Sequence, residues 1–288
     1  MQAKKHILKL FKGILLVVAT IALTVVIKVF LFASFKVPTG SMEPTILPGD
    51  YVLVNKLLIG PRIYQDFGFL KGKKTPYKRI KGMRQIRGND VLVFDAPYLI
   101  AGALKKMPDQ YYVKRCVGVP GDIFLIENGI FKIRGYTDTL GNFQNQLLLS
   151  RTPDEIFGKE TFNCFPYDTA HHWNIKHFGP LYIPGKGDCI ELNQQNIALY
   201  EPLIQYETEK RITIKEGQIF LDGEPLSAYT FTQNYYFMAG DYVSASHDSR
   251  YWGLLPEDFV VGRATLIWQS ENPETGRYRW NRFFKEMK

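Results

Sequence analysis

The first strong pattern along the chain is an apolar run from Gly13 to Phe35. Its only interruptions are Thr20, Thr24, Lys28 and Ser34. As a helix rising ~1.5 Å per residue it would be roughly 34 Å long, enough to cross a bilayer with some tilt. Before the run stand Lys4, Lys5, Lys9 and Lys12, and the flank after it is much less basic. The pattern predicts a membrane anchor with the N-terminus in the cytoplasm and the remaining chain outside.

A cleaved signal peptide is the competing interpretation of this run. The run is long for such a peptide, and no pair of small residues at a cleavage spacing ends it. We therefore expect residues 1–36 to form a cytoplasmic N-terminus and a single-pass anchor.

Beyond the anchor the polar pattern has a period of two. Alternating apolar residues follow Gly49-Asp50, Asn89-Asp90, Gly121-Asp122 and Gly187-Asp188. Each of these reads as a turn that leads into a short strand. Asn128-Gly129 and Asp222-Gly223 lie between alternating runs, which is the strongest short hairpin signal. The sequence thus predicts a mainly antiparallel β domain behind one transmembrane helix.

Composition and charge mainly argue against certain classes of function and of binding site. The aromatic content of 14% favours strands, and the net charge of +8 is spread along the chain without a nucleic-acid-binding motif. Three cysteines are too few for a disulfide framework, although pairing of Cys164 with Cys189 stays open. The histidines at 171, 172 and 177 match no standard zinc spacing, so we expect neither a metal nor a cofactor.

Candidate chemistry begins directly after the anchor. Ser41 lies in Pro38-Thr39-Gly40-Ser41-Met42-Glu43-Pro44-Thr45-Ile46, where the prolines and Gly40 favour a turn or extended segment that presents one hydroxyl. Lys114 interrupts an apolar strand pattern in Tyr112-Val113-Lys114-Arg115-Cys116. An ammonium on an apolar face is costly unless it is paired or neutral. A neutral lysine is a base, and a base beside a serine makes a nucleophile.

A later loop concentrates polar side chains between glycines. In Ser246-His247-Asp248-Ser249-Arg250-Tyr251-Trp252-Gly253 the aromatic neighbours indicate a partly buried ion pair between Asp248 and Arg250. His247 is an alternative base because histidine titrates near neutrality, but no Ser-His-Asp arrangement with it is visible. The chain ends in a short basic, aromatic tail over 273–288, of a kind that rests on lipid headgroups.

Four segments in this order, behind an anchor, resemble the bacterial type I signal peptidases, which are membrane-bound Ser-Lys endopeptidases. The segments are Pro38-Thr39-Gly40-Ser41-Met42-Glu43-Pro44-Thr45, Arg87-Gly88-Asn89-Asp90-Val91-Leu92-Val93-Phe94, Tyr112-Val113-Lys114-Arg115-Cys116-Val117-Gly118-Val119-Pro120-Gly121-Asp122, and Gly240-Asp241 with Ser246-His247-Asp248-Ser249-Arg250-Tyr251-Trp252-Gly253. Each segment is a weak signal alone, whereas four in order are a strong one.

The resemblance implies a role for each matched residue. Ser41 would be the acylated nucleophile and Lys114 the general base. Thr39 stands where the family has a serine whose hydroxyl joins the Ser41 N–H in an oxyanion hole, and Ser246 would orient the Lys114 amine. Asp248 with Arg250 matches a structural ion pair, and Arg115 a second supporting charge. Pockets for small side chains would be lined by Phe35, Val37, Met42, Ile46, Val52, Tyr112 and Val113.

The chain departs from the family pattern at two places. Tyr242-Val243-Ser244-Ala245 replaces the usual polar residues after Gly240-Asp241, and Asn89 inserts into the usual Arg-Gly-Asp, where we expect a bulged turn. Neither departure removes a candidate catalytic atom.

The resemblance and the apolar run together predict an enzyme of the bacterial inner membrane that removes signal peptides from secreted preproteins near the secretion translocon. We expect residues 37–121 and 236–272 to form the catalytic core and 122–235 an inserted β cap. Two alternatives stay open: another Ser-Lys peptidase that cleaves itself, and an inactive, membrane-anchored β-scaffold that binds secreted chains. The first normally carries a DNA-binding segment, which is not visible here, and the presence of both Ser41 and Lys114 argues against the second.

Overall fold

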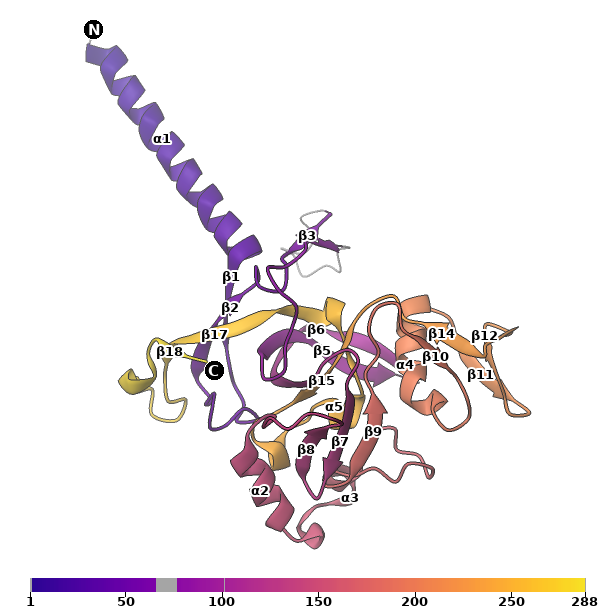
Figure 1. Cartoon of the computed structure of the whole chain (residues 1–288). Helices are drawn as coiled ribbons and strands as arrows, with labels where there is room; N and C mark the ends of the chain where they lie inside the picture. The colour runs from indigo at the N-terminus through magenta and orange to yellow at the C-terminus, as the bar shows by residue number, and fades with distance from the viewer. Residues whose placement is uncertain (1, 66–76, 101, 288) are drawn as a thin grey trace.

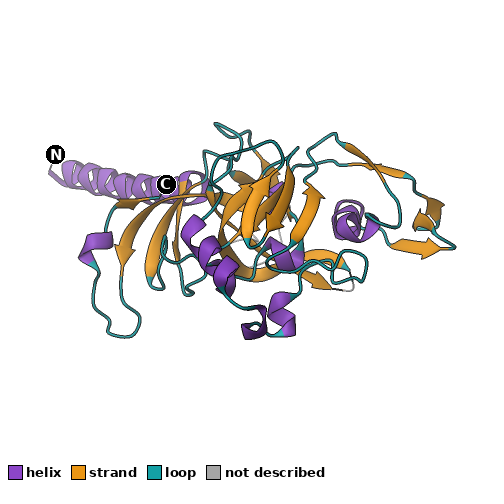
Figure 2. Cartoon of the chain, turned by 60° about the horizontal axis from the view of Figure 1, so that its bottom comes forward, coloured by secondary structure: helices purple, strands orange, loops and turns teal. Residues whose placement is uncertain are grey.

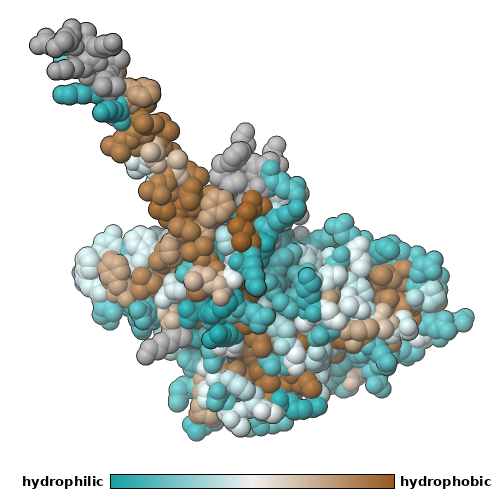
Figure 3. All heavy atoms as spheres, turned by 45° about the horizontal axis from the view of Figure 1, so that its top comes forward, coloured by the Kyte–Doolittle hydropathy of each residue, from teal (hydrophilic) through white to brown (hydrophobic). Residues whose placement is uncertain are grey.

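The computed structural model describes residues 2–65, 77–100 and 102–287 (Figure 1). Helix α1 (Gln2–Val26) continues through a π-helical turn, η1 (Ile27–Leu31), and projects from a β-rich body. From Lys9 to Leu31 the helix is long and apolar enough to cross a membrane, and none of it is buried against the body. In Figure 3 most of this stretch is brown, with teal atoms near its N-terminal end and paler patches further along. The Thr20 and Thr24 hydroxyls donate to carbonyls one turn earlier, so they leave no unpaired polar group on the helix.

The helical span is shorter than the apolar run. Residues Phe32–Lys36 form strand β1, although we expected the anchor to continue to Phe35. Every residue of β1 is in register with β2 (Asp50–Asn55), so the backbone there is paired in a β-ladder instead of a helix. The apolar helix therefore passes into the main sheet without an intervening linker.

The main sheet is antiparallel, and its strands follow the order β1-β2-β17-β5-β6-β15-β16, with β18 paired to β17. Its remaining strands are β5 (Val91–Ile100), β6 (Ala103–Gly118), β15 (Tyr235–Ala239), β16 (Leu255–Pro256), β17 (Val260–Ser270) and β18 (Lys285–Glu286). This arrangement confirms the predicted antiparallel β fold behind one apolar helix. Figure 2 shows that strands make up most of the body and that helices lie around them.

Smaller elements lie around this sheet. The hairpin β3 (Arg62–Tyr64) and β4 (Tyr77–Arg79) is near the base of the anchor. The other small sheets are β8-β7-β9 (Ile130–Ile133, Ile123–Glu127, Phe178–Tyr182), β10-β14 (Cys189–Glu191, Ala228–Thr230) and β11-β12-β13 (Ile212–Lys215, Gln218–Leu221, Glu224–Pro225). The helices are α2 (Phe143–Arg151), α3 (Lys159–Phe162), α4 (Ile197–Thr208) and α5 (Ser249–Trp252). Short 3₁₀ turns are η3 (Asp154–Ile156), η4 (Val243–Ala245), η5 (Glu257–Phe259) and η6 (Trp280–Arg282).

One turn geometry recurs before four of the strands. In each case the aspartate that follows the positive-φ residue accepts a hydrogen bond from the backbone N–H three residues earlier; these aspartates are Asp50, Asp90, Asp122 and Asp188. The preceding residue has a φ between 68° and 93°, as the third position of a type II turn requires. Glycine occupies that position three times and Asn89 once. The expected bulge at Asn89 is therefore wrong, because asparagine tolerates the same left-handed conformation.

Two hydrophobic clusters lie on opposite faces of β6. Alternate residues of a strand point to opposite faces, so Tyr112 and Cys116 contact the larger cluster, whereas Val113 contacts the smaller one. The smaller cluster contains Val37, Met42, Ile46, Val52 and Val54 together with Val91, Val93, Val261, Ala264, Ile267 and Met287. Because this smaller cluster includes Met42 and Ile46, it packs against the segment that carries Ser41.

Candidate active site

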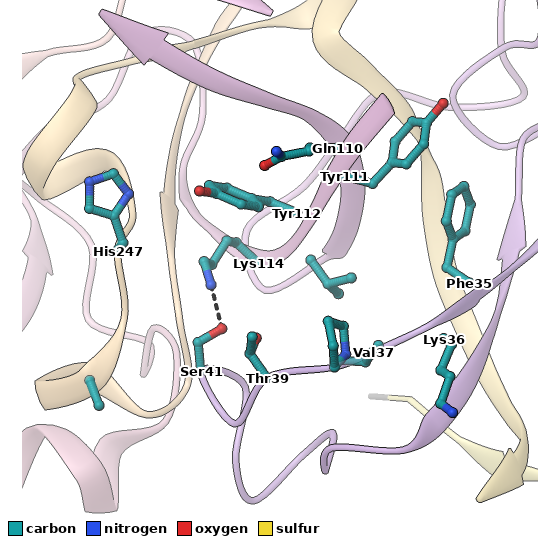
Figure 4. Close-up of a pocket in the computed structure, with 13 residues that line it drawn as sticks. Phe35, Lys36, Val37, Thr39, Ser41, Gln110, Tyr111, Tyr112, Lys114 and His247 are labelled. Atoms are coloured by element: carbon teal, nitrogen blue, oxygen red, sulfur yellow. Dashed lines mark hydrogen bonds between the residues drawn. The ribbon is translucent and has the colours of Figure 1, made fainter. Parts of the chain in front are cut away.

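The structure brings Ser41 and Lys114 into direct contact. Ser41 lies on the turn that follows β1, and Lys114 lies within β6, 73 residues further along the chain. The Lys114 Nζ is 2.5 Å from the Ser41 Oγ (Figure 4). A nucleophile and a base at hydrogen-bond distance are the minimum geometry for activating a hydroxyl.

The turn around Ser41 is held by the loop that carries Asp241. Tyr242 N–H donates to the Ser41 carbonyl at 3.1 Å, and the Thr45 hydroxyl donates to the Asp241 carboxylate at 2.5 Å. Both Asp241 oxygens also accept hydrogen bonds from the Arg115 guanidinium, at 2.8 and 2.7 Å. Bidentate arginine–carboxylate pairs have a strict geometry. Arg115 therefore supports the site by fixing Asp241, which in turn anchors the serine turn.

Gly240 allows this close approach. A Cβ atom at that position would collide with the Ser246 side chain and with the Ser41 carbonyl. Only glycine permits a backbone to come so near to two other groups. The glycine before Asp241 thus brings the last polar loop against the serine turn.

Lys114 is almost fully withdrawn from water, with 5% of its surface exposed. Burial lowers the pKa of its amine to about 8, since the charged form loses solvation. The Asp248 carboxylate raises this pKa, Arg250 lowers it, and Asp241 raises it, so the charges partly offset one another. The amine is consequently neutral in about a tenth of the molecules at pH 7, far more than for a lysine with an ordinary pKa.

Asp248 and Arg250 form a completely buried ion pair, with Nε to Oδ1 at 2.8 Å and Nη2 to Oδ2 at 2.9 Å. Asp248 also accepts the Gly240 N–H at 2.9 Å, and Arg250 donates to the Val243 carbonyl at 2.7 Å. Removing one partner of such a pair leaves an uncompensated buried charge. The pair therefore holds the loop from Gly240 to Trp252 in its shape beside Lys114.

Ser246 is buried near the same glycine, but its hydroxyl does not make the expected bond to Lys114. Among the described residues its Oγ has no hydrogen-bond partner. The Lys114 amine is instead directed to Ser41. An orienting role for Ser246 would require the amine or the hydroxyl to rotate from the positions seen here.

A pocket of about 580 Å³ opens in front of the pair (Figure 4). One wall comes from the end of β1 and the segment after it, and the other from β6. Of the seven predicted pocket residues, the pocket lining includes Phe35, Val37, Tyr112 and Val113.

The remaining three predicted pocket residues, Met42, Ile46 and Val52, do not line it. Each has at most 1% of its surface exposed, because it packs in the smaller hydrophobic cluster beneath the pocket. The predicted contact of these three residues with substrate stays a prediction, and in the structure they form the layer behind the pocket wall. Thr39 does line the pocket, beside Ser41.

Several residues around the pocket were not found from the sequence. The lining also includes Lys36, Pro38, Gln110, Tyr111, Ala245 and His247. Phe35 and Tyr111 meet across the pocket, with ring centroids 5.0 Å apart. Gln110 lies four residues before Lys114 on the same strand, so it faces the same side and could have been predicted from the sequence. No sequence pattern identifies Ala245.

Asn145, on α2, is a further residue that the sequence did not reveal. Its side-chain amide donates to the Glu43 carbonyl at 3.1 Å and to the Asp241 carbonyl at 2.7 Å. It thereby ties the two loops that flank Ser41. Asn145 lies 102 residues from Glu43 and 96 from Asp241, so no local sequence signal marks this role.

The structure gives little support to a histidine base, a metal site or a disulfide. His247 stacks on Tyr251 with ring centroids 5.2 Å apart, and burial lowers the pKa of its imidazole. Its side chain points away from Ser41 in Figure 4. In the described part of the chain no cluster of three or more potential metal ligands occurs. The three cysteines are free; Cys116 and Cys164 are buried, and Cys189 is exposed.

Comparison with known proteins agrees with this arrangement. The family described as "Signal peptidase, peptidase S26" matches residues 9–269. A signal peptidase I of Buchnera aphidicola is 29% identical over 268 residues, covering 90% of this chain and 75% of that protein. Those of Haemophilus influenzae and Helicobacter pylori are 28% and 27% identical, covering 93% and 94% of this chain and 73% and 90% of theirs. The family match spans both Ser41 and Lys114, and the chain therefore belongs to the signal peptidase family, peptidase S26.

Proposed function

We propose that the protein is a membrane-bound serine endopeptidase that removes signal peptides from preproteins with a Ser41–Lys114 dyad. The observation that carries this proposal is the 2.5 Å contact between a half-buried serine hydroxyl and a lysine amine whose pKa is about 8. An unshifted lysine, with a pKa near 10.4, would be charged at neutral pH and could not accept a proton.

In the acylation step, neutral Lys114 Nζ takes the proton from Ser41 Oγ as that oxygen attacks the scissile carbonyl carbon. The resulting ammonium returns the proton to the leaving amine, the peptide C–N bond breaks, and the signal peptide remains as an ester on Ser41. Water then attacks this ester with the same lysine as base, which releases the carboxylate and restores the serine.

The negative oxygen formed during attack needs hydrogen-bond donors. We assign this role to the Ser41 N–H and the Thr39 hydroxyl. Among the described residues no acceptor takes the Ser41 N–H, and Thr39 lines the pocket beside it. Donors that are already oriented toward the developing charge supply a large part of the catalysis in acyl-transfer enzymes.

The substrate is best accommodated as an extended chain between the two pocket walls. Residues Tyr112 to Lys114 pair with β5 on one edge, and β15 pairs with β6 only from Arg115 onward. The other edge of 112–114 is thus available to a substrate strand, whose alternate side chains would enter the pocket. The apolar lining and limited volume favour small apolar side chains there.

We place the enzyme in the bacterial inner membrane as a single-pass protein with its N-terminus in the cytoplasm. The basis is the lysine-rich start of the chain and the apolar helix from Lys9 to Leu31. Residues 37–121 with 236–272 would be the catalytic unit, 122–235 a cap, and 273–288 a tail on the headgroups. Preproteins that leave the translocon would then reach the site from the outer side.

A cleavage assay on a purified preprotein tests the catalytic part of the proposal. Ser41→Ala and Lys114→Ala should each abolish release of the mature protein, whereas Lys132→Ala, at an exposed surface ion pair, should cleave like the wild type. Activity retained in Ser41→Ala would refute the dyad. Protease added to intact spheroplasts tests topology: the body should be digested, and full protection would contradict the orientation.

A further inference from the structure

The junction between anchor and body has no linker. The helical span ends at Leu31, and the next residue, Phe32, is already paired with Asn55 in the main sheet. No flexible segment separates the membrane helix from the strand that leads to Ser41 (Figure 1). Any movement of the anchor relative to the sheet must therefore bend the backbone near Leu31.

Lys56 of the body holds the end of the anchor through three hydrogen bonds. Lys56 directly follows β2, and its Nζ donates to the carbonyls of Lys28 at 2.8 Å and Val29 at 3.1 Å. Its backbone N–H donates to the Leu31 carbonyl at 2.9 Å. The last carbonyls of a helix have no partner within the helix. Lys56 thus satisfies three of the five carbonyls of η1.

The chemistry of this contact suits a lysine. The C-terminal end of a helix carries partial negative charge, which a cation stabilises. The Lys56 side chain is half-buried and makes two hydrogen bonds, so it is not a fully solvated surface group. This burial, together with the charge of Arg62, lowers the pKa of its amine to about 8. The loop after it is fixed as well, since the Asn55 side chain accepts the Leu57 N–H at 2.9 Å.

We propose that Lys56 is a positioning residue that locks the anchor to the catalytic sheet and so sets the height and angle of the pocket above the membrane. The inference rests on the proposed function. At most nine residues separate Leu31 from Ser41, and β1 is extended, so a tilt at the junction moves the serine relative to the bilayer. The scissile bond of a substrate held in the same bilayer would then no longer lie opposite the Ser41 hydroxyl.

This role predicts an effect that depends on the substrate. A short soluble peptide can adjust its own position, so loss of the lock should barely change its cleavage. A preprotein whose signal peptide is embedded in the bilayer cannot adjust freely. Misplacement of reacting groups by about 1 Å can cost on the order of 100-fold, and a partly loosened junction should cost about tenfold.

The test compares full-length Lys56→Met with wild type in liposomes on two substrates. One is a soluble peptide with small residues before its cleavage site, and the other is a membrane-inserted preprotein with zero to four residues added between apolar segment and cleavage site. We expect kcat/KM for the preprotein to fall about tenfold and its dependence on spacer length to flatten, while the value for the peptide stays within twofold. Lys56→Arg should restore most of the preprotein activity, because it keeps a cationic donor.

Lys132→Met is the matched control, since it removes an ion-paired lysine from the β7–β8 hairpin. An equal loss on both substrates would show a purely structural role and overturn the inference, as would no loss on either. If Lys56→Met does not fold, a Gly-Ser-Gly linker between Leu31 and Phe32 replaces it, and the same selective loss is expected. Wild-type protein that cleaves neither substrate would instead refute the proposed function.

Discussion

The pKa of Lys114 leads to the most direct prediction. Its ordinary value is 10.5 and burial lowers it to about 8. Because the base must be neutral, kcat/KM for a soluble peptide should rise with pH and level off above about pH 8. Below that pH the activity should fall about tenfold per unit, which leaves roughly 1% at pH 6. Lys114→Arg should be inactive throughout, since a guanidinium keeps its proton in this range.

The same shift has a consequence for stability. Between pH 8 and 10.5 the unfolded chain holds a proton on Lys114 that the folded protein has lost, so this group makes stability rise with pH. Below pH 8 its burial costs the fold about 3 kcal/mol, because one pKa unit corresponds to ~1.36 kcal/mol. Lys114→Met should therefore stabilise the protein at pH 7 by up to about 3 kcal/mol, or roughly 6–12 °C in Tm. At pH 11 the gain should vanish.

Two measurements check this reasoning. The first is the pH profile of peptide cleavage in detergent. The second is thermal unfolding of wild type, Lys114→Met and the surface control Lys132→Met at pH 7 and pH 11. A cleavage profile that levels off near pH 6.5 would indicate a histidine base, and a Lys114→Met protein less stable than wild type at pH 7 would show that burial does not penalise the amine.

Three further changes separate the remaining roles. If the Ser246 hydroxyl orients the base during catalysis, Ser246→Ala should lower kcat by about 10²–10³-fold with KM nearly unchanged. The variant should not lower Tm, because that hydroxyl has no hydrogen-bond partner to lose among the described residues. A change in kcat below threefold would exclude the orienting role. His247→Ala should keep most activity in the same peptide assay, and an inactive variant would overturn the lysine mechanism. Asn145→Leu should lower kcat about tenfold by releasing the carbonyls of Glu43 and Asp241, whereas an unchanged kcat would show that the turn is held without it.

Local sequence signals were sufficient for much of the fold. Gly49, Asn89 and Gly121 take positive φ at the turns that open strands, and Asn128-Gly129 forms the β7–β8 hairpin turn. Such positions are readable because few residue types tolerate that backbone conformation. The apolar run likewise revealed the helix, although not its end, since an apolar residue such as Phe32 suits a membrane helix and a strand equally well.

The sequence identified candidate site residues only where the residue type was unusual for its position. A lysine at an apolar strand position and a serine in a proline-bounded turn pointed to Ser41 and Lys114, and the order of the motifs connected them. Their contact, across 73 residues, is a product of the sheet, which sets the serine turn after β1 against β6.

Only the tertiary structure decided which neighbours face the pocket. Met42, Ile46 and Val52 have the composition of a substrate pocket but lie in the core: Val52 is on the buried face of β2, and Met42 and Ile46 lie on the turn after β1, whose path turns their side chains into the smaller cluster. Asn145 and Lys56 act through hydrogen bonds to backbone carbonyls, which every residue possesses and no sequence pattern identifies. The sequence by itself determined the apolar helix and most strands and pointed to Ser41 and Lys114, whereas long-range packing brought these two side chains together and determined the shape of the pocket and the contacts that hold it in place.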